Sequence, residues 1–276
     1  MPDGPKPVPW DLDRRAAGQA QPDTGPLSIS AAACGHCGAR DQSVCRNVGR
    51  KDLLRLFPCG VRTQDRPAGT TLFHQGEPFD FVLILRSGWV VTYKVFEDGQ
   101  RQIIRFALPG DLIGFEGDAV SGMAYGAEAI TNVTVCGVKR SRFLRVCAES
   151  PQLAMNFANT LARETLSAWN HVAALGQQGA LGRVANLLLD LHRRVVSRGG
   201  ANGAAVHLPI SQIHIGDATG LTSVHVCRTL KQMRQDGLLE FRKERLVLLD
   251  PRRLAEVAQL DPEVALDCPS PRLAVV

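Results

Sequence analysis

Short runs of β-type residues, separated by glycine-containing turn signals, fill the chain between residues 53 and 145. This pattern restricts the fold more than any other feature of the sequence. Residues 81–85 and 89–93 are two of these runs, and an Arg-Ser-Gly turn signal at residues 86–88 separates them. Many short strands at such spacing are typical of an all-β roll or barrel. The sequence therefore predicts a β-roll domain, which we place at residues 51–149.

Helical periodicity replaces the β pattern near Ser150 and Pro151, where a capping residue precedes a proline suited to the first turn of a helix. Apolar residues then recur at helical spacing for about seven turns. They are Leu153, Phe157, Leu161, Leu166, Trp169 and Val172. A helix this long covers its own domain with part of its surface and more readily buries the remainder against a second copy of the chain. We therefore predict a dimerisation helix over residues 150–176, with these six side chains in the interface.

Residues 210–237 have the pattern of two short helices joined by a tight turn. Ile213 and Ala218 would share one face of the first helix. Gly220 stands where the chain must turn sharply, a position that favours a residue tolerant of positive φ. Thr222 is a good N-cap for the second helix. Two such helices form the motif that places the second helix in the major groove of DNA.

The second of these helices has an inward stripe of Val226, Leu230 and Met233, and Gly237 suits the position after its last turn. Two apolar runs then flank a basic segment at residues 242–245, which we interpret as a two-stranded wing. A generic helical hairpin in an enzyme would require neither polar residues at the start of the helix nor a basic wing. The candidates for DNA contact are Thr222, Ser223, Val224, His225, Arg228, Lys231 and Arg242.

We expect Arg228 to read a guanine through a bidentate contact to O6 and N7, although a phosphate contact is an alternative. Lys231 and Arg242 suit contacts to the DNA backbone, which position the protein without specifying sequence. Residues 180–250 contain ten Lys or Arg against six Asp or Glu, a net charge of +4, which is compatible with nucleic acid. We place the winged helix-turn-helix domain, with a C-terminal tail, at residues 177–276.

Three of the eight cysteines, Cys34, Cys37 and Cys45, lie within one twelve-residue segment. In a reducing compartment such clustering indicates metal binding or redox chemistry. The spacing suits a cluster or a metal whose fourth ligand comes from elsewhere. A zinc site, which usually has paired Cys-x2-Cys knuckles, and a disulfide switch without metal are alternatives. We predict a cysteine-rich segment at residues 31–50, after a disordered segment rich in Pro and Gly at residues 1–30.

We expect a cytoplasmic protein with no membrane segment. The most apolar stretch, residues 81–85, is far too short to cross a bilayer and is followed at once by Arg86. Residues 1–33 are rich in Pro, Gly, Asp and Arg and lack the apolar run of a secretory signal peptide.

Over residues 34–250 the chain resembles the CRP/FNR family of transcription regulators. Three motifs in the predicted roll carry the resemblance, together with the helix-turn-helix: Gly69-Thr-Thr-Leu-Phe-His-Gln-Gly-Glu77, Leu85-Arg-Ser-Gly-Trp-Val90 and Leu108-Pro-Gly-Asp-Leu-Ile-Gly-Phe115. The resemblance implies an α+β fold with an N-terminal cyclic-nucleotide-binding-like β-roll (jelly roll), a long dimerisation helix and a C-terminal winged helix-turn-helix. It also implies a homodimer that binds a palindromic operator in double-stranded DNA and acts, as an activator, by contacting RNA polymerase.

The cysteine pattern is similar to that of FNR-type oxygen sensors, which combine a closely spaced N-terminal trio with one distant cysteine from the roll. The distant cysteine matches Cys136, in the run Thr-Val-Cys-Gly-Val. By this resemblance Cys34, Cys37, Cys45 and Cys136 would ligate a 4Fe–4S cluster. Such a cluster would promote the dimeric DNA-binding state under anaerobiosis and would be lost on exposure to oxygen.

Family members that bind cyclic AMP neutralise its phosphate with a cation. Here no Lys or Arg occurs between Arg105 and Lys139, and the position where the family has its arginine carries Gly126. The sequence therefore argues against a cyclic nucleotide. Another small effector bound in the roll is an alternative to the cluster. An enzyme is not expected, because the chain has no Gly-rich phosphate loop, no Ser/His/Asp arrangement and no His-x-x-x-His helix.

The recognition helix departs from the family pattern. FNR-like recognition helices usually read Glu-x-x-Ser-Arg, whereas the matching positions here are Val224, Cys227 and Arg228. Loss of the glutamate removes the usual acceptor for the amino groups of cytosine or adenine. We therefore expect a guanine preference through Arg228 within an operator that differs from the family's.

Overall fold

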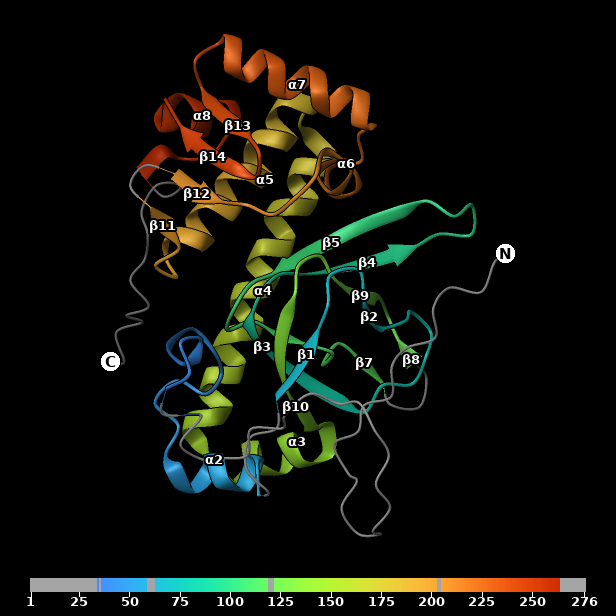
Figure 1. The fold of residues 1–276 in the computed structure, drawn as a ribbon, viewed down its shortest axis with the longest axis vertical. Helices are drawn as coiled ribbons and strands as arrows, with labels where there is room; N and C mark the ends of the chain where they lie inside the picture. Colours follow the sequence, from blue (N-terminus) through green and yellow to red (C-terminus); the bar gives the residue numbers. More distant parts are fainter. Residues whose placement is uncertain (1–33, 35, 59–62, 119–121, 203–204, 264–276) are drawn as a thin grey trace. The chain divides into compact units, whose positions relative to one another are not determined.

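The computed structural model describes residues 34, 36–58, 63–118, 122–202 and 205–263 of the 276-residue chain (Figure 1). The chain divides into two compact units, one comprising residues up to 100 together with 105–163, the other residues 101–104 together with 164–276. Strands dominate the first unit and helices the second, so the predicted α+β class is confirmed. The segment predicted to be disordered, residues 1–30, lies outside the described residues.

Short strands separated by glycine turns build the first unit, as the β-type runs predict. The strands form two four-stranded sheets, ordered β1-β10-β3-β6 and β2-β9-β4-β5, and a small β7–β8 ribbon. The order joins strands that are distant in sequence, which is typical of a jelly roll. The strands are β1 Thr63–Arg66, β2 Thr71–Phe73, β3 Phe81–Ser87, β4 Val90–Val95, β5 Arg101–Ala107, β6 Leu112–Ile113, β7 Gly117–Asp118, β8 Gly122–Met123, β9 Gly126–Ala129 and β10 Val133–Lys139.

The two faces of β10 belong to different apolar clusters, because successive side chains of a strand point to opposite sides. Val133 and Val135 lie in the cluster between the two sheets. Cys136 and Val138 lie in a second cluster, on the side of the sheet where the helices of this unit pack. The second cluster also contains Cys45, so the pleat of β10 turns Cys136 toward the cysteine-rich segment.

Three helices cover the second cluster. They are α2 (Arg50–Leu56), α3 (Arg140–Glu149) and the beginning of α4 (Pro151–Gln177). A short 3-10 helix, η1 (Arg40–Gln42), lies within the cysteine-rich segment. The position of α4 agrees with the predicted helix at residues 150–176, and its first apolar residue, Leu153, is fully buried in this cluster.

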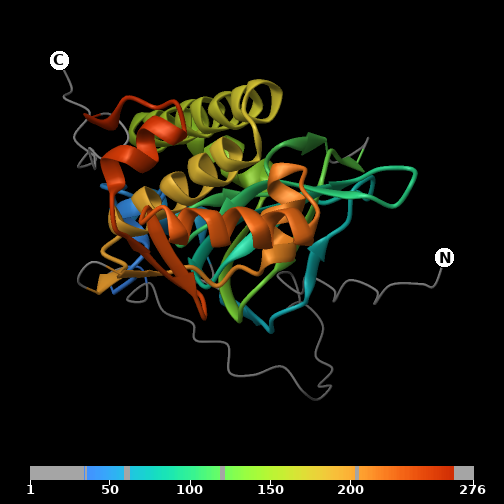
Figure 2. The same cartoon turned by 90° about the horizontal axis from the view of Figure 1, so that it is seen from above.

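The second unit contains the remainder of α4, helix α5 (Ala180–Val196) and the elements that follow. They are β11 Ala201–Asn202, β12 Ala205–His207, α6 Gln212–Thr219, α7 Ser223–Gln235, β13 Leu239–Arg242, β14 Arg245–Leu248 and α8 Pro251–Val257. Figure 2 looks onto α7, the long orange helix, with the β13–β14 hairpin beside it.

The predicted wing is present as β13 and β14. Its turn residues Lys243 and Glu244 have φ of 49° and 61°, as a two-residue hairpin of type I′ requires. Strands β12 and β11, which the sequence did not predict, extend the wing to a four-stranded sheet in the order β11-β12-β14-β13. Among the described residues, no helix is long and apolar enough to cross a membrane.

Candidate functional site

Helices α6 and α7 are joined by a turn whose geometry matches the prediction. Gly220 has a φ of 67° in the left-handed region and donates its N–H to the carbonyl of Gly216. Thr222 caps α7, because its hydroxyl accepts the N–H of His225 at 3.3 Å. Ser211 caps α6 in the same way through the N–H of His214, at 3.2 Å. The predicted turn glycine and helix cap are therefore confirmed.

Gly216 lets the turn pack closely on α6. A Cβ at this position would stand 2.5 Å from the carbonyl oxygen of Leu221, which real side chains do not tolerate. Gly216 was not among the residues predicted from the sequence. The signal that marks it is a glycine inside a short helix, which costs about 1 kcal/mol relative to alanine and therefore suggests a packing role.

The exposure pattern of α7 agrees with its predicted phase. Val226 and Met233 are fully buried and Leu230 nearly so, which anchors the helix in its unit. The opposite face is open to solvent and bears Ser223, Val224, His225, Cys227, Arg228 and Lys231. The cap residue Thr222 and the wing residue Arg242 are also exposed. Every residue predicted to contact DNA is therefore accessible, while the contacts themselves stay predictions.

The prediction that Ile213 and Ala218 share one face of α6 is wrong. Ile213 is 63% exposed, whereas Ala218 is buried together with Ile215 and Thr219. The helix begins at Gln212, directly after the Ser211 cap, so Ile213 falls in the first turn on the solvent side.

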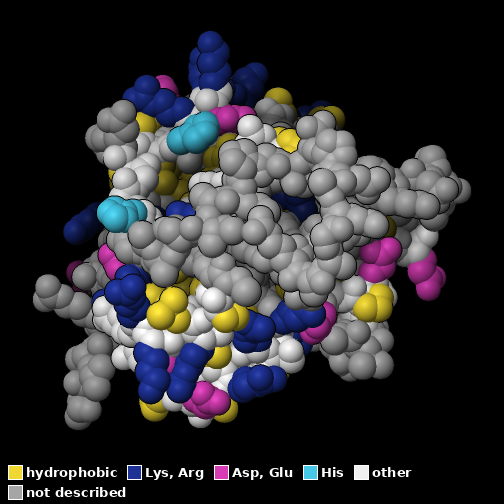
Figure 3. All heavy atoms as spheres, turned by 60° about the horizontal axis from the view of Figure 1, so that its bottom comes forward, with side chains coloured by type: hydrophobic (Ala, Val, Ile, Leu, Met, Phe, Trp, Pro, Cys, Tyr) yellow, Lys and Arg dark blue, Asp and Glu magenta, His cyan; other side chains and the backbone are white. Residues whose placement is uncertain are grey.

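Positive charge is not confined to the recognition helix. Figure 3 shows a face of the molecule on which Lys and Arg side chains are prominent among hydrophobic ones. Helices α2 and α3 also bear exposed basic residues, among them Arg50, Lys51, Arg55 and Arg145. The net charge of +5 therefore does not locate the DNA-binding face. The capped turn and the phase of α7 favour this helix as the one that contacts DNA.

The four predicted cluster ligands gather in the first unit. Cys45 and Cys136 are buried in the same apolar cluster, and Cys34 packs against it half-buried. Cys37 is also half-buried, and its thiol raises the pKa of each of the other three cysteines. The fold therefore brings the N-terminal trio to the distant cysteine on β10.

Burial dominates the protonation of these thiols. It raises the pKa of Cys45 to about 12; the thiols of Cys34 and Cys37 add to this effect, while a hydrogen bond from Ser43 and the charge of Arg40 oppose it. Burial also raises the pKa of Cys136 strongly, and the charge of Arg86 opposes that shift. Both buried thiols are therefore protonated at neutral pH unless a bound cation compensates.

The backbone around Cys45 is held by side chains, since this stretch has turns but no regular structure. The hydroxyl of Ser43 accepts the N–H of Cys45 at 3.1 Å. Arg40 donates to the carbonyl of Cys45 at 3.4 Å and to that of Val48 at 2.9 Å. From α4, the amide of Asn156 donates to the carbonyls of Val44 and Arg46, at 2.9 Å and 2.6 Å.

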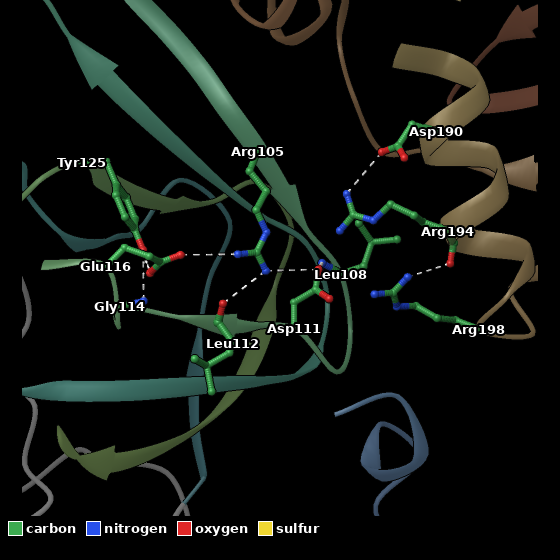
Figure 4. Close-up of polar contacts among 10 residues, drawn as sticks. All are labelled: Arg105, Leu108, Asp111, Leu112, Gly114, Glu116, Tyr125, Asp190, Arg194 and Arg198. Carbon is green, nitrogen blue, oxygen red and sulfur yellow. Dashed lines mark hydrogen bonds and ion pairs between the residues drawn. The ribbon is translucent and has the colours of Figure 1, made fainter. Parts of the chain in front are cut away.

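Polar residues of the roll form a network around Arg105, drawn in Figure 4. The guanidinium lies 3.6 Å from both Asp111 and Glu116 and donates to the carbonyl of Leu112. Tyr125 donates its hydroxyl to Glu116. Burial and the neighbouring Glu116 raise the pKa of Tyr125 well above its usual value. The positive charge of Arg105 is thus shared between two carboxylates.

Gly126 faces an aromatic ring. A Cβ at this position would lie 2.8 Å from the ring of Tyr93, so a larger side chain requires that ring to move. This contact gives Gly126 a packing role in the roll.

The predicted dimer stripe on α4 separates into two parts. Leu153 is fully buried within its own chain, so its assignment to the interface was wrong. Phe157 packs against Phe115 and Phe143, and Leu161 is half-buried. Leu166, Trp169 and Val172 are 56%, 65% and 66% exposed, and Met155, which was not among the predicted residues, is 59% exposed. An apolar face thus follows α4 on the side away from its own core.

Comparisons with known proteins agree with this architecture. Residues 63–150 match the cyclic nucleotide-binding domain family, and residues 182–257 match the Crp-like helix-turn-helix domain family. The chain is 33% identical to the nitrogen fixation regulation protein FixK of Bradyrhizobium diazoefficiens over 226 residues, 82% of this chain and 93% of that protein. It is 32% identical to the transcriptional activatory protein AadR of Rhodopseudomonas palustris over 224 residues, 81% and 92% of the two chains.

A solved structure shares the fold. The structure of FixK2 from Bradyrhizobium japonicum superposes with a TM-score of 0.64 at 32% identity, covering 71% of this chain and 96% of that one. The fold and the exposed recognition helix together define a DNA-binding transcription regulator. More specifically, the chain belongs to the CRP/FNR family. Because the proteins of this family are regulators, the expectation that the chain is not an enzyme is confirmed.

Proposed function

We propose that this chain is an oxygen-responsive transcription regulator of the cytoplasm, in which Cys34, Cys37, Cys45 and Cys136 hold a 4Fe–4S cluster. One observation carries the proposal. Cys45 and Cys136 are buried in one apolar cluster, and Cys34 packs against the same cluster. Only the fold achieves this, because Cys136 is distant from the trio in sequence.

The donor set suits a cluster better than zinc. A four-iron cluster binds each thiolate at a different iron atom, whereas zinc requires its ligands to converge on one ion. The apolar surroundings of Cys45 and Cys136 limit solvent access, and Arg40 and Arg86 favour the thiolate form at these two positions.

When bound, the cluster would link the cysteine-rich segment to β10 by bonds that oxygen destroys. The segment contributes Val44, Cys45 and Val48 to the apolar cluster that also buries Leu153 at the beginning of α4. A segment that is held in place therefore completes the packing surface on which α4 rests. A segment that is released leaves part of that surface open to water.

The exposed face of α4 supports dimerisation. Leu166, Trp169 and Val172 are mostly exposed, and burial of each by a partner helix would contribute about 1–2 kcal/mol, since part of each side chain is already buried. A dimer would set its two recognition helices about 34 Å apart, one turn of DNA, and so match a palindromic operator. A shift of a few kcal/mol in this equilibrium changes operator occupancy by orders of magnitude. Activation would then follow by contact with RNA polymerase, as the family resemblance implies.

The test is anaerobic purification of the parent and of two serine variants. We expect brown protein with broad absorbance near roughly 400 nm, the thiolate-to-iron region, and loss of binding to DNA selected from a random duplex pool after exposure to air. Cys136→Ser should lose iron and sulfide. Cys147→Ser should keep both, because Cys147 packs against the same apolar cluster but lies outside the ligand set. A colourless parent containing zinc, or a Cys136→Ser variant with full iron and sulfide, would refute the proposal.

A further inference from the structure

Asn156 binds the backbone on both sides of a predicted cluster ligand. Its side-chain amide donates to the carbonyl of Val44 at 2.9 Å and to that of Arg46 at 2.6 Å, so it brackets Cys45. The amide oxygen accepts from Gln152 at 2.9 Å. With its oxygen engaged on the helix, both N–H groups of the amide are directed to the cysteine-rich segment. One side chain of α4 thus forms two hydrogen bonds with the backbone of this segment.

These hydrogen bonds cross between elements that are far apart in the chain. The carbonyls of Cys45 and Val48 are held by Arg40, which belongs to the same segment. Asn156 instead lies on α4, more than a hundred residues further along the chain. A displacement of the segment at Cys45 therefore changes two hydrogen bonds to α4 directly.

Asn156 lies at the edge of the inward face of α4. Leu153 and Thr160 are buried on that face, at helical spacing from Asn156. Met155 is the preceding residue, about 100° around the helix, and is 59% exposed on the outward face. The two hydrogen bonds of Asn156 therefore act beside the packing of Leu153 to hold one rotation of α4 about its axis.

We propose that Asn156 is the positioning residue that transmits the state of the cysteine-rich segment to α4. While Cys45 is held, the two carbonyls fix the amide of Asn156 and the rotation of the helix suits pairing. When Cys45 is released, the carbonyls move and the helix loses that constraint. This inference rests on the proposed function, since it explains how occupancy of the cysteine site reaches the dimer.

The experiment compares the parent with Asn156→Ala and with a matched control, Asn159→Ala. The control makes the same substitution three residues further along α4, at a side chain that contacts neither carbonyl. Each protein is studied without oxygen in its iron-loaded form and after iron removal by a chelator. Iron and sulfide contents are measured, and the dimer dissociation constant of both forms is determined by analytical ultracentrifugation. The ratio of the two dissociation constants measures how strongly the iron content of the cysteine site affects dimerisation.

We expect Asn156→Ala to keep the iron and sulfide content of the parent. Its ratio of dissociation constants, iron-free over loaded, should fall roughly ten- to hundredfold, as the loss of two ordinary hydrogen bonds implies. Amide hydrogen exchange at residues 44–48 should become faster in the loaded form. Asn159→Ala should match the parent in each measurement. Asn156→Asp keeps the shape but lacks both donors, so it should behave like Asn156→Ala and replaces it if the alanine variant does not fold.

An unchanged ratio in Asn156→Ala or Asn156→Asp overturns the inference. Loss of iron in these variants also overturns it, because Asn156 would then serve the ligand site and not transmission. If dimerisation weakens equally in the iron-loaded and iron-free forms, Asn156 is a merely structural residue, and the inference is overturned. If the parent holds no iron, or dimerises equally with and without it, the proposed function fails and this inference with it; that outcome is visible in the parent alone.

Discussion

Phe157 of α4 stands edge-on to Phe115, with the ring centroids 4.5 Å apart and the ring planes at 72°. Phe143 of α3 meets the ring of Phe157 in the same way at 5.2 Å. Such edge-to-face pairs contribute about 0.5–1.5 kcal/mol beyond the area they bury. The three rings join α3 and α4 to the loop after β6, so this part of α4 belongs to the core of the first unit.

We therefore expect Phe157→Ala to lower the free energy of unfolding by about 2–4 kcal/mol, since the ring is only half-buried and the loss is less than for a fully buried phenylalanine. Urea denaturation at protein concentrations that favour the monomer measures this effect. Trp169→Ala is the matched control. It removes an exposed aromatic ring from the same helix and should change monomer stability by less than about 0.5 kcal/mol while weakening dimerisation. The reverse pattern would contradict the division of the helix into two faces.

The contact of Gly216 with the carbonyl of Leu221 makes a second prediction. Gly216→Ala should destabilise the second unit by about 1–3 kcal/mol and weaken DNA binding, because the turn before α7 must move away from α6. Gly176→Ala tests the same chemistry in open space on α4, and there alanine should be neutral or stabilising by about 0.5–1 kcal/mol. Thermal unfolding of both variants distinguishes them, and equal effects would show that the close contact is unimportant.

Arg228 and Lys231 should respond differently to substitution, although both are exposed on α7. Arg228→Ala should cost about 1–3 kcal/mol against the preferred operator and little against random DNA, as expected for a residue that reads a base. Lys231→Ala should weaken binding to all sequences and reduce the slope of log affinity against log salt by about 1. Fluorescence anisotropy across a salt series measures both. If the two variants lose specificity equally, the assigned roles are wrong.

Acid should destabilise the second unit through two half-buried histidines, His171 and His192. Burial lowers the pKa of His171 on α4 and of His192 on α5 below the usual 6.5. As the pH falls through 6.5, these histidines are protonated in the unfolded chain before they are protonated in the folded chain. The free energy of unfolding is therefore at its full value above this pH and decreases as the pH falls. Urea unfolding between about pH 7.5 and pH 5.5 should show this loss, and His171→Gln should reduce it. A variant with the same pH dependence as the parent would exclude His171 as its source.

Local signals predicted the DNA-binding motif well. The φ of Gly220, the cap at Thr222 and the buried stripe of α7 each depend on neighbouring residues, so the sequence pattern contains them. The error at Ile213 arose because one apolar residue in a short helix fits two phases, and the Ser211 cap decides between them.

Contacts between distant elements could not be predicted in the same way. The burial of Leu153 depends on packing against β-strands and the cysteine-rich segment, and nothing in the spacing of the helix separates it from Trp169. The role of Asn156 depends on two backbone carbonyls more than a hundred residues earlier. A polar residue on a long helix is ordinary in sequence, and only the folded chain identifies its partners.

The alternation of side chains along β10 limits how this regulator can change during evolution. The register of β10 against β3 already shifts once, between Thr134 and Val135, directly before Cys136. Insertion or deletion of a single residue there would turn the thiol of Cys136 inward between the sheets, out of reach of the other three cysteines. Loops elsewhere in the roll can vary in length, but the number of residues in this strand must stay the same for Cys136 to face the cysteine-rich segment.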